Sequence, residues 1–385
     1  MKTIRDLDIE EKRTLIRVDF NVPLDENGHI TDDTRIRRSL KTIERALEKK
    51  AKIILASHMG RPGGKPDPAL SLSPAAARLG ELLGETVRLA PLQDMAAGVG
   101  EGEIVLLENL RFHPGEEENS DDFGRSLAGL CDVYINEAFS VSHRQNASVC
   151  AVARHAPETG AGFLLESELL WHERAFQSPA RPLAAVIGGA KISGKIEALK
   201  NLADIVDILI IGGAMANTFL KSAGIGVGKS LFEEKRLDMA RAVMESARER
   251  GPELLIPVDV AASGTLEAGA EREVFAAGEI PEDQMALDIG PETSAIFAKA
   301  LGRARTIVWN GPMGAFEYPP FDRGTMDMAR SVAESGAFSA AGGGDTVAAV
   351  NRAGAADKIS HISTGGGAFL ALLEGKTLPG VAALH

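Results

Sequence analysis

Arginine side chains recur where the aliphatic runs in the first half of the chain end. Arg61, Arg111 and Arg144 each follow such a run, and Arg35 opens an amphipathic stretch at 31–49 that is typical of a helix. A planar guanidinium binds carboxylate and phosphate groups through two parallel hydrogen bonds. Several guanidiniums at one edge therefore predict a site for a small substrate that carries both groups.

Other polar side chains accompany these arginines at the ends of the same runs: Asp19, Asn21, His58, Asn109, Asn136 and His143. A histidine beside arginine could donate a hydrogen bond to a bound anion. Any single arginine could instead pair with a surface carboxylate and contribute little. Recurrence weakens that reading for the set, although Arg17, inside the first run, is the arginine best explained as structural.

Glycine takes the corresponding positions in the second half of the chain. The clusters are Gly188-Gly189, Gly212-Gly213, Asn310-Gly311, Gly342-Gly343-Gly344 and Gly365-Gly366-Gly367. Without a Cβ, glycine lets backbone N–H groups approach phosphate oxygens closely, and a following helix adds its positive N-terminus. One such pair only indicates a tight turn, but repetition at one edge predicts a nucleotide site.

Three charged residues stand beside these glycines. Lys191 and Lys195 are four residues apart, so a helix beginning at Lys191 would place both ammonium groups on one face. Asp345 follows three glycines, and it could cap a helix or bind a nucleotide-bound Mg²⁺. Isolated lysines would otherwise be solvated surface charges.

Two segments resemble phosphate-binding loops but fail on chemistry. Residues 189–196 have the right glycine and lysine spacing but place Ile196 where a hydroxyl must bind Mg²⁺. Residues 223–230 have Ala223 in place of the first glycine. No G-x-G-x-x-G follows the first aliphatic run, which disfavours a dinucleotide site.

Short aliphatic runs alternate with stretches of helical period throughout, which predicts an α/β protein with parallel sheets. The expected strand segments are 14–22, 52–58, 86–90, 103–110 and 131–139 in a first series, and 182–190, 206–214, 253–261, 305–312, 337–345 and 359–367 in a second. Because single cores stop growing near about 250 to 300 residues, a chain of 385 residues predicts two domains. We place them at 1–163 and 179–367, joined by a helix at 164–178.

Composition narrows the classes of partner. The formal charge of −12 disfavours nucleic acid and anionic membranes as partners. The charged start and the lack of an apolar run of about 18 residues predict a soluble, cytoplasmic protein. Cys131 and Cys150 are expected to be buried thiols, and the acidic run at 116–118 a solvated loop.

Seven motifs, in order, closely resemble the phosphoglycerate kinase family. They are RVDFNVP (17–23), SHMGRP (57–62), ENLRFH (108–113), GGAKISGKIEALKNL (188–202), WNGPMGAFE (309–317), GGGDT (342–346) and STGGGAFLALLEGK (363–376). The resemblance implies two Rossmann-like domains facing each other across a hinged cleft. It also implies a return of residues 368–385 to the N-terminal domain.

The resemblance further implies reversible, Mg²⁺-dependent phosphoryl transfer between ATP and the carboxylate of 3-phosphoglycerate, giving ADP and 1,3-bisphosphoglycerate, by a monomer. The implied substrate residues are Asp19, Asn21, Arg35, His58, Met59, Gly60, Arg61, Arg111 and Arg144. The implied nucleotide residues are Lys195, Gly212, Gly213, Leu287, Asn310, Glu317, Gly343, Gly344, Asp345 and Thr346, with Asp345 as the metal ligand. The expected catalytic groups are Arg35, Lys191, Gly343, Gly344, Gly366 and Gly367.

One segment departs from the family pattern. Residues 136–146 read NEAFSVSHRQN where the family commonly has NDAFGTAHRAH, so Asn146 replaces a histidine and Ser140 a glycine. The lost histidine puts substrate affinity or its pH dependence in doubt. Two other functions fit the sequence less well: a hinge-closing anion-binding protein without catalysis would not need Lys191, Lys195 and the GGGDT turn, and an NAD-linked dehydrogenase would need the missing G-x-G-x-x-G.

Overall fold

The computed structural model describes residues 1–385, leaving out the side chains of residues 96, 97 and 250. Contacts between residues divide the chain into two units. The first comprises Met1–Leu170 and Thr377–His385, and the second comprises Trp171–Lys376. The return segment thus begins at Thr377 rather than at residue 368, and the division falls within the segment expected to join the domains.

The first unit is built on one parallel sheet with the strand order β3-β4-β2-β1-β5-β6. Its strands are β1 (Arg13–Arg17), β2 (Lys52–Ala56), β3 (Val87–Ala90), β4 (Ile104–Leu107), β5 (Val133–Asn136) and β6 (Glu158–Ala161). They are shorter than the expected segments, because all of these segments except 86–90 also included residues of the turn after the strand. Strand β6 was not predicted, since its sequence ETGA contains no aliphatic run.

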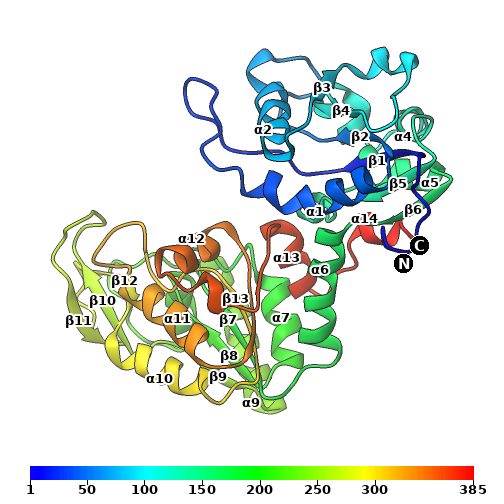
Figure 1. The fold of residues 1–385 in the computed structure, drawn as a ribbon. Helices are drawn as coiled ribbons and strands as arrows, with labels where there is room; N and C mark the ends of the chain where they lie inside the picture. Colours follow the sequence, from blue (N-terminus) through cyan, green and yellow to red (C-terminus); the bar gives the residue numbers. More distant parts are fainter. The chain divides into compact units, whose positions relative to one another are not determined.

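Helices cover both faces of this sheet (Figure 1). They are α1 (Thr34–Glu48), α2 (Ser73–Leu83), α3 (Pro114–Glu117), α4 (Asp121–Ala128), α5 (Val152–His155) and α14 (Pro379–Ala382). Single turns complete the unit at η1 (Pro68–Leu70), η2 (Leu92–Ala97), η3 (Leu110–Phe112), η4 (Phe139–Val141) and η5 (Ala147–Ala151).

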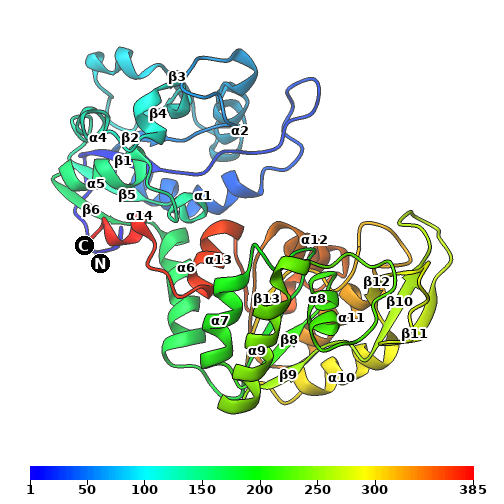
Figure 2. The ribbon, with the colours of Figure 1, turned by 180° about the vertical axis from the view of Figure 1, so that it is seen from behind.

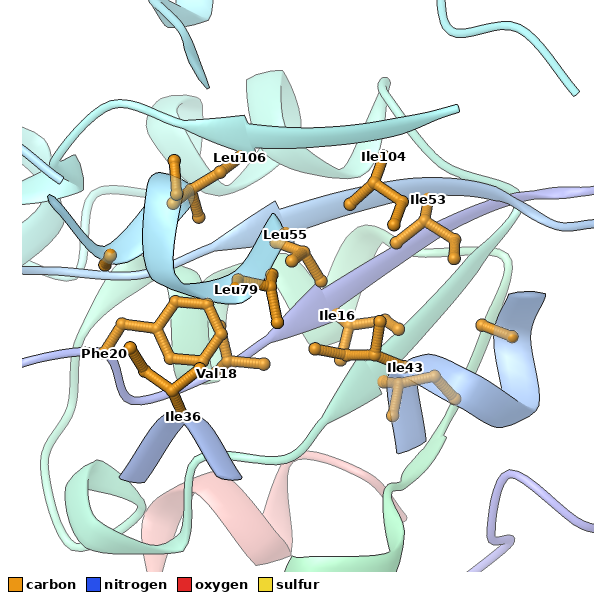
Figure 3. Close-up of a cluster of buried hydrophobic side chains, with 14 of the residues drawn as sticks. Ile16, Val18, Phe20, Ile36, Ile43, Ile53, Leu55, Leu79, Ile104 and Leu106 are labelled. Atoms are coloured by element: carbon orange, nitrogen blue, oxygen red, sulfur yellow. The ribbon is translucent and has the colours of Figure 1, made fainter. Parts of the chain in front are cut away.

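Alternate strand residues and a helical stripe form the core of the first unit. Figure 3 shows Ile36 and Ile43 of α1 and Leu79 of α2 beside Ile16 of β1 and Leu55 of β2. All five side chains are at most 1% exposed. The spacing in α1 is that of an amphipathic helix, and the opposite face of α1 stays in solvent.

The second unit is built on another parallel sheet, with the order β15-β14-β13-β7-β8-β9. Its strands are β7 (Leu183–Ile187), β8 (Ile208–Ile211), β9 (Glu253–Leu255), β13 (Thr306–Asn310), β14 (Phe338–Ala341) and β15 (His361–Ile362). The prediction of an α/β fold with two parallel-sheet domains is therefore confirmed.

A small antiparallel sheet in the second unit was not predicted. It has the order β11-β10-β12, with β10 (Asp259–Ser263), β11 (Glu273–Ala276) and β12 (Met285–Ile289). The segment 253–261, expected as one strand, divides between this sheet and β9. Pro257 lies at the division, and proline has no N–H to donate to a sheet.

Two helical layers enclose the six-stranded sheet of the second unit. Helices α10, α11 and α12 lie on the face seen in Figure 1, and α7, α8 and α9 on the face seen in Figure 2. The helices are α7 (Ile196–Ile205), α8 (Met215–Ser222), α9 (Leu237–Arg250), α10 (Pro291–Leu301), α11 (Arg323–Glu334), α12 (Gly344–Arg352) and α13 (Gly366–Leu373), with single turns η7 (Glu234–Arg236) and η8 (Ala356–Lys358).

The helix after β6 carries the chain from one unit to the other. It is α6 (Phe163–His172), which continues as the π-helical turn η6 (Glu173–Gln177). Buried Glu137 holds its first turn, because its carboxylate accepts from Leu164 N at 3.0 Å and from Thr42 Oγ1 at 2.7 Å. Among the described residues, no helix is long and apolar enough to cross a membrane.

Candidate functional site

Both six-stranded sheets contain a topological switch point, where the strands that follow in the fold lie on opposite sides of one central strand. In the first sheet β1 lies between β2 and β5, and in the second β7 lies between β8 and β13. Ligands of open parallel sheets bind beyond the carboxyl ends of the strands at such points. The arginine and glycine clusters lie after these strands.

Asp19 connects three elements of the first unit. Its carboxylate accepts from Arg35 Nη1 of α1 at 3.1 Å and from the Ser140 hydroxyl, and its Oδ1 accepts from Asn21 N at 3.1 Å. Arg35 Nη1 also donates to Asn21 O at 2.6 Å. The turn after β1 and the start of α1 therefore form one connected polar group.

The backbone of Gly60 joins two further predicted residues. Asn21 Oδ1 accepts from Gly60 N at 3.0 Å, and Arg111 Nη1 donates to Gly60 O at 2.6 Å. Asn109 donates to Met59 O at 2.7 Å. Gly60 has a φ of 60°, a left-handed conformation that favours glycine. The turn after β2 is thus fastened to the turns after β1 and β4.

A buried layer lies beneath these groups. Arg17 donates to Ser148 Oγ at 2.7 Å, and Ser148 Oγ in turn lies 2.6 Å from Glu116. Glu116 is 0% exposed, so the prediction of a solvated acidic loop is wrong at this residue. The reason is that Glu116 lies in a short helix beside η5, where its charge meets Ser148 and, at 4.0 Å, Arg17.

His58 is neutral in this setting. Burial lowers the pKa of His58 to about 3, although Asp19, whose Oδ1 lies 3.9 Å from Nδ1, acts in the opposite direction. Arg17 Nη2 lies 3.3 Å from the same ring nitrogen. Burial also opposes ionisation of Asp19, yet its interactions with His58, Arg35, Ser140 and Arg17 hold its pKa below the usual range. The pair is an anionic carboxylate beside an uncharged imidazole.

Arg111, Arg144 and Arg61 are the remaining positively charged residues predicted for this site. Burial lowers the pKa of Arg111, and the charge of Arg144 adds to that effect. Arg144 and His143 are half-buried, whereas Arg61 is exposed. Among the described residues His143 Nδ1 has no hydrogen-bond partner. These groups retain donors for an anion.

The departure at Asn146 is structural in this chain. Asn146 is 6% exposed, and its amide donates to Glu116 O at 3.2 Å. The side chain therefore supports the buried layer and does not join the exposed donors.

In the second unit, Lys195 turns inward between two strand ends. Its ammonium donates to Gly188 O at 2.5 Å and Asn310 O at 3.1 Å. Burial lowers the pKa of Lys195 to about 8, with Asp345 acting in the opposite direction. Helix α7 begins only at Ile196, so the prediction of a helix starting at Lys191 is wrong. Gly194 and the capping position of Lys195 keep the chain in a turn there, and Lys191 is exposed.

The glycines after β7, β8 and β13 pack against one another. A Cβ on Gly213 would lie 2.5 Å from Gly189 N, and one on Gly311 would lie 2.5 Å from Lys195 Nζ. Gly212 lies against Met313. Gly213 and Gly311 also have φ values of 69° and 102°. These glycines therefore permit three turns to meet, rather than only ending their strands.

The GGGDT turn is fixed by side chains from the neighbouring strand end. Asn310 Nδ2 donates to Gly342 O at 2.7 Å, and Thr346 Oγ1 accepts from Gly311 N at 2.7 Å. Gly343 has a φ of 99° directly before α12. A Cβ on Gly366 would lie 3.3 Å from Gly343 Cα, so the N-termini of α12 and α13 begin side by side.

A cavity of ≈ 390 Å³ opens beside these turns. Its walls are mainly apolar, with Glu317 and Asp345 as carboxylates. The lining residues are Gly189, Ala190, Ala214, Leu231, Leu266, Met285, Ala286, Leu287, Pro312, Gly314, Ala315, Glu317, Tyr318 and Asp345. Gly212, Gly213, Asn310 and Thr346 are not among these lining residues, although Gly213 packs against the lining residues Gly189 and Pro312.

The donor set suits a metal that arrives with a ligand. Asp345 is exposed in the first turn of α12 and lines the cavity. Among the described residues, no three His, Cys, Asp or Glu side chains gather in a way that could hold an ion. One carboxylate together with nucleotide phosphates is a usual arrangement for Mg²⁺.

Several residues at these sites were not singled out from sequence. Ser140 and Ser148 orient Asp19 and Arg17, and Leu231, Leu266 and Tyr318 line the cavity. A lone serine carries no pattern that distinguishes a bonded hydroxyl from a solvated one. The three apolar cavity residues are 41% to 56% exposed, which becomes visible only in three dimensions.

Comparison with known proteins gives one consistent result. A family model described as phosphoglycerate kinase matches residues 4–376. Proteins of that name from Desulfosudis oleivorans and Desulforapulum autotrophicum are 54% and 53% identical; the alignments cover 100% of this chain and 99% and 100% of theirs. The solved phosphoglycerate kinase from Coxiella burnetii has a TM-score of 0.94 at 44% identity, covering 99% of this chain and 98% of that one. The one from Pyrococcus horikoshii has a TM-score of 0.85 at 31% identity, covering 100% and 98%.

Proposed function

This chain belongs to the phosphoglycerate kinase family, and from that premise we propose which of its residues carry the reaction. The enzyme transfers a phosphoryl group reversibly between ATP and the carboxylate of 3-phosphoglycerate, giving ADP and 1,3-bisphosphoglycerate. The observation that carries this function is the similarity to relatives named phosphoglycerate kinase, whose length this chain covers almost completely.

We assign 3-phosphoglycerate to the arginine cluster of the first unit. The assigned residues are Asp19, Asn21, Arg35, His58, Met59, Gly60, Arg61, Arg111 and Arg144. Support comes from the hydrogen bonds that connect Asp19, Asn21 and Gly60 to two of the arginines. Neutral His58 would donate a hydrogen bond, whereas the guanidiniums would neutralise carboxylate and phosphate charge.

We assign the nucleotide to the cavity of the second unit. Leu287 would contact adenine, Glu317 the ribose hydroxyls, and the turn from Gly343 to Thr346 the phosphates. Support comes from Leu287, Glu317 and Asp345 lining one cavity, and from Gly343 opening α12, whose N-terminus favours anions. Lys195, Gly212, Gly213 and Asn310 would shape this site.

We assign Mg²⁺ to Asp345 as part of the nucleotide complex. Its exposed carboxylate fits one coordination position, with phosphate oxygens and water taking the others. Bound there, the ion would neutralise charge on the phosphates.

The chemistry explains why positively charged and N–H groups dominate. A carboxylate nucleophile is already ionised near pH 7, because carboxyl pKa values lie near about 4, so no general base is needed. Catalysis then consists of positioning and charge stabilisation. We assign the second task to Arg35, Lys191 and the N–H groups of Gly343, Gly344, Gly366 and Gly367. The adjacency of Gly343 and Gly366 supports grouping their N–H groups.

A cytoplasmic location, predicted from the sequence, is a further proposal, and so is a monomeric state, which rests on the family resemblance. So is the division into a 3-phosphoglycerate domain, a joining helix at 164–178 and a nucleotide domain. Because each unit holds one proposed half-site, transfer requires the two bound substrates to be brought together.

A coupled assay tests the function directly. Purified protein with Mg²⁺, ATP and 3-phosphoglycerate should release ADP, and omission of 3-phosphoglycerate should abolish the release. An anion-binding protein without catalysis would bind both ligands yet release no ADP. Absence of turnover would overturn the assignment.

A further inference from the structure

The segment between β13 and α11 forms one wall of the nucleotide cavity. Glu317 and Tyr318 lie in this segment, and both line the cavity. The segment is fastened to β12 at two points: Ala315 N donates to Leu287 O at 2.8 Å, and Gly324 N donates to Asp288 Oδ2 at 2.7 Å. Leu287 and Asp288, which are adjacent residues of β12, therefore hold this segment at both points.

Asp288 is built into this contact. It is 4% exposed, and its second carboxylate oxygen accepts from Ile289 N at 2.9 Å. A Cβ on Gly324 would lie 2.5 Å from Asp288 Oδ1, and one on Gly314 would lie 2.7 Å from Asp288 Cβ. Only glycine fits at either position, so the segment closes directly around this carboxylate.

Two other side chains brace the same segment. Thr325 Oγ1 accepts from Met313 N at 3.0 Å, which ties the two ends together. Arg352 of α12 donates to Phe316 O at 2.8 Å and to Asp322 at 2.7 Å. Phe316, the residue before Glu317, is therefore held by α12, the helix that begins at the GGGDT turn.

The charges around Asp288 come from two sides. Arg272, ahead of β11, and Asp322, ahead of α11, both act on it electrostatically. Burial raises the pKa of Asp288 to about 8, while the N–H groups of Gly324 and Ile289 oppose this rise. Burying a carboxyl group is costly unless its oxygens are hydrogen-bonded, and here both oxygens accept from backbone N–H groups.

We propose that Asp288 is a positioning residue for nucleotide binding, which holds the 313–325 segment so that Glu317 faces the cavity. The proposal rests on the function assigned above to Glu317. Asp288 does not line the cavity itself, so it acts only through the segment. Its influence should fall on nucleotide affinity and leave the 3-phosphoglycerate site of the other unit unchanged.

Asp288→Asn tests this with little change in size. In an assay above about pH 8, where the Asp288 carboxyl group is ionised, the substitution turns one acceptor oxygen into an NH₂ group, which must face the N–H of Gly324 or Ile289. Losing a buried hydrogen bond of this kind should raise KM for ATP by about 5- to 100-fold. KM for 3-phosphoglycerate and kcat should stay within about twofold. Asp327→Asn, at a partly exposed carboxylate on α11 (43% side-chain exposure), is the matched control and should change neither KM.

A double-mutant cycle with Glu317→Ala separates positioning from simple loss of stability. If Asp288 acts through Glu317, Asp288→Asn should raise KM for ATP little further once Glu317 is removed. Equal effects of Asp288→Asn in both backgrounds would overturn the proposal. An effective Glu317→Ala together with a silent Asp288→Asn would also overturn it. A silent Glu317→Ala would instead overturn the assigned function of Glu317.

A second variant covers the case in which Asp288→Asn does not fold. Thr325→Val keeps the side-chain shape and removes the acceptor for Met313 N. It should raise KM for ATP selectively, as Asp288→Asn does. Equal changes in both KM values would show that the segment has no selective effect on nucleotide and would overturn the proposal.

Discussion

Arg17 donates from Nη2 to Nδ1 of His58 across 3.3 Å, and both side chains are at most 3% exposed. A guanidinium has no acceptor, so Nδ1 accepts and the imidazole proton resides on Nε2. The ring is thereby fixed as a neutral donor at Nε2. This relationship leads to a test that distinguishes the two ring nitrogens.

Replacing His58 by Gln should preserve more affinity for 3-phosphoglycerate than replacing it by Asn. The Gln amide places its NH₂ near the position of Nε2, whereas the Asn amide places it near Nδ1, opposite Arg17. We expect KM for 3-phosphoglycerate to rise about tenfold more in the Asn variant, the equivalent of one hydrogen bond to an anion. Steady-state kinetics at fixed ATP measures this, and the reverse order would contradict the assignment.

Lys191→Ala should lower kcat by about 10²-fold or more while nucleotide affinity changes little, because an interaction with the transferring phosphoryl is strongest in the transition state. Lys191 is exposed, so its loss should not unfold the chain. Lys200→Ala is the control, since Lys200 pairs with Glu197 on the surface of α7. A rise in KM with unchanged kcat would make Lys191 a ground-state binding residue.

Glu137→Gln should reduce the loss of stability between about pH 5 and pH 8. Burial raises the pKa of Glu137 to about 8 from 4.5, although Thr42 and Leu164 oppose the rise. The folded state thus binds the proton more tightly than the unfolded state, and folding stability falls as pH rises through this window. At roughly 1.4 kcal/mol per pKa unit, the loss is on the order of a few kcal/mol.

Calorimetric melting at both pH values measures this effect. Glu44→Gln, at an exposed position on α1, is the control and should follow the unmodified chain. If stability fell equally with rising pH in the Glu137→Gln variant and in the unmodified chain, the raised pKa of Glu137 would be contradicted.

Both substrates together should compact the molecule in solution, whereas either alone should do less. The reason is that transfer to a carboxylate must exclude water, which could otherwise accept the phosphoryl group. Small-angle scattering with 3-phosphoglycerate and a non-hydrolysable ATP analogue measures the radius of gyration. An unchanged radius would remove domain closure from the mechanism.

The fold class could be read from sequence because buried parallel strands are continuous aliphatic runs. Segments such as 52–58 and 206–214 contain β2 and β8. Strand β6 escaped detection because ETGA is held by pairing with β5 rather than by its own pattern. The division at Pro257 was visible in principle, since proline disfavours a continuous inner strand.

The sequence could indicate which residues belong to the sites, but it could not show how their side chains are oriented or buried. Recurrent arginine and glycine marked the strand ends, because those residue types are chemically distinctive. The inward turn of Lys195 was not predictable, since helical spacing from Lys191 gave no reason to start α7 at Ile196. Buried partners such as Glu116 and Asp288 were also missed, because burial of a carboxylate depends on contacts between distant segments.

The return of the last residues to the first unit bears on how the chain is made. Gly380 N donates to Ser142 O at 2.9 Å, and Asn136 Nδ2 donates to Gly380 O at 3.3 Å, at the carboxyl end of β5. Ribosomal synthesis proceeds from the N-terminus, so residues 1–170 emerge long before this partner exists. The second unit, Trp171–Lys376, is therefore the part that can complete its contacts first. The first unit is translated earlier but completes its contacts last.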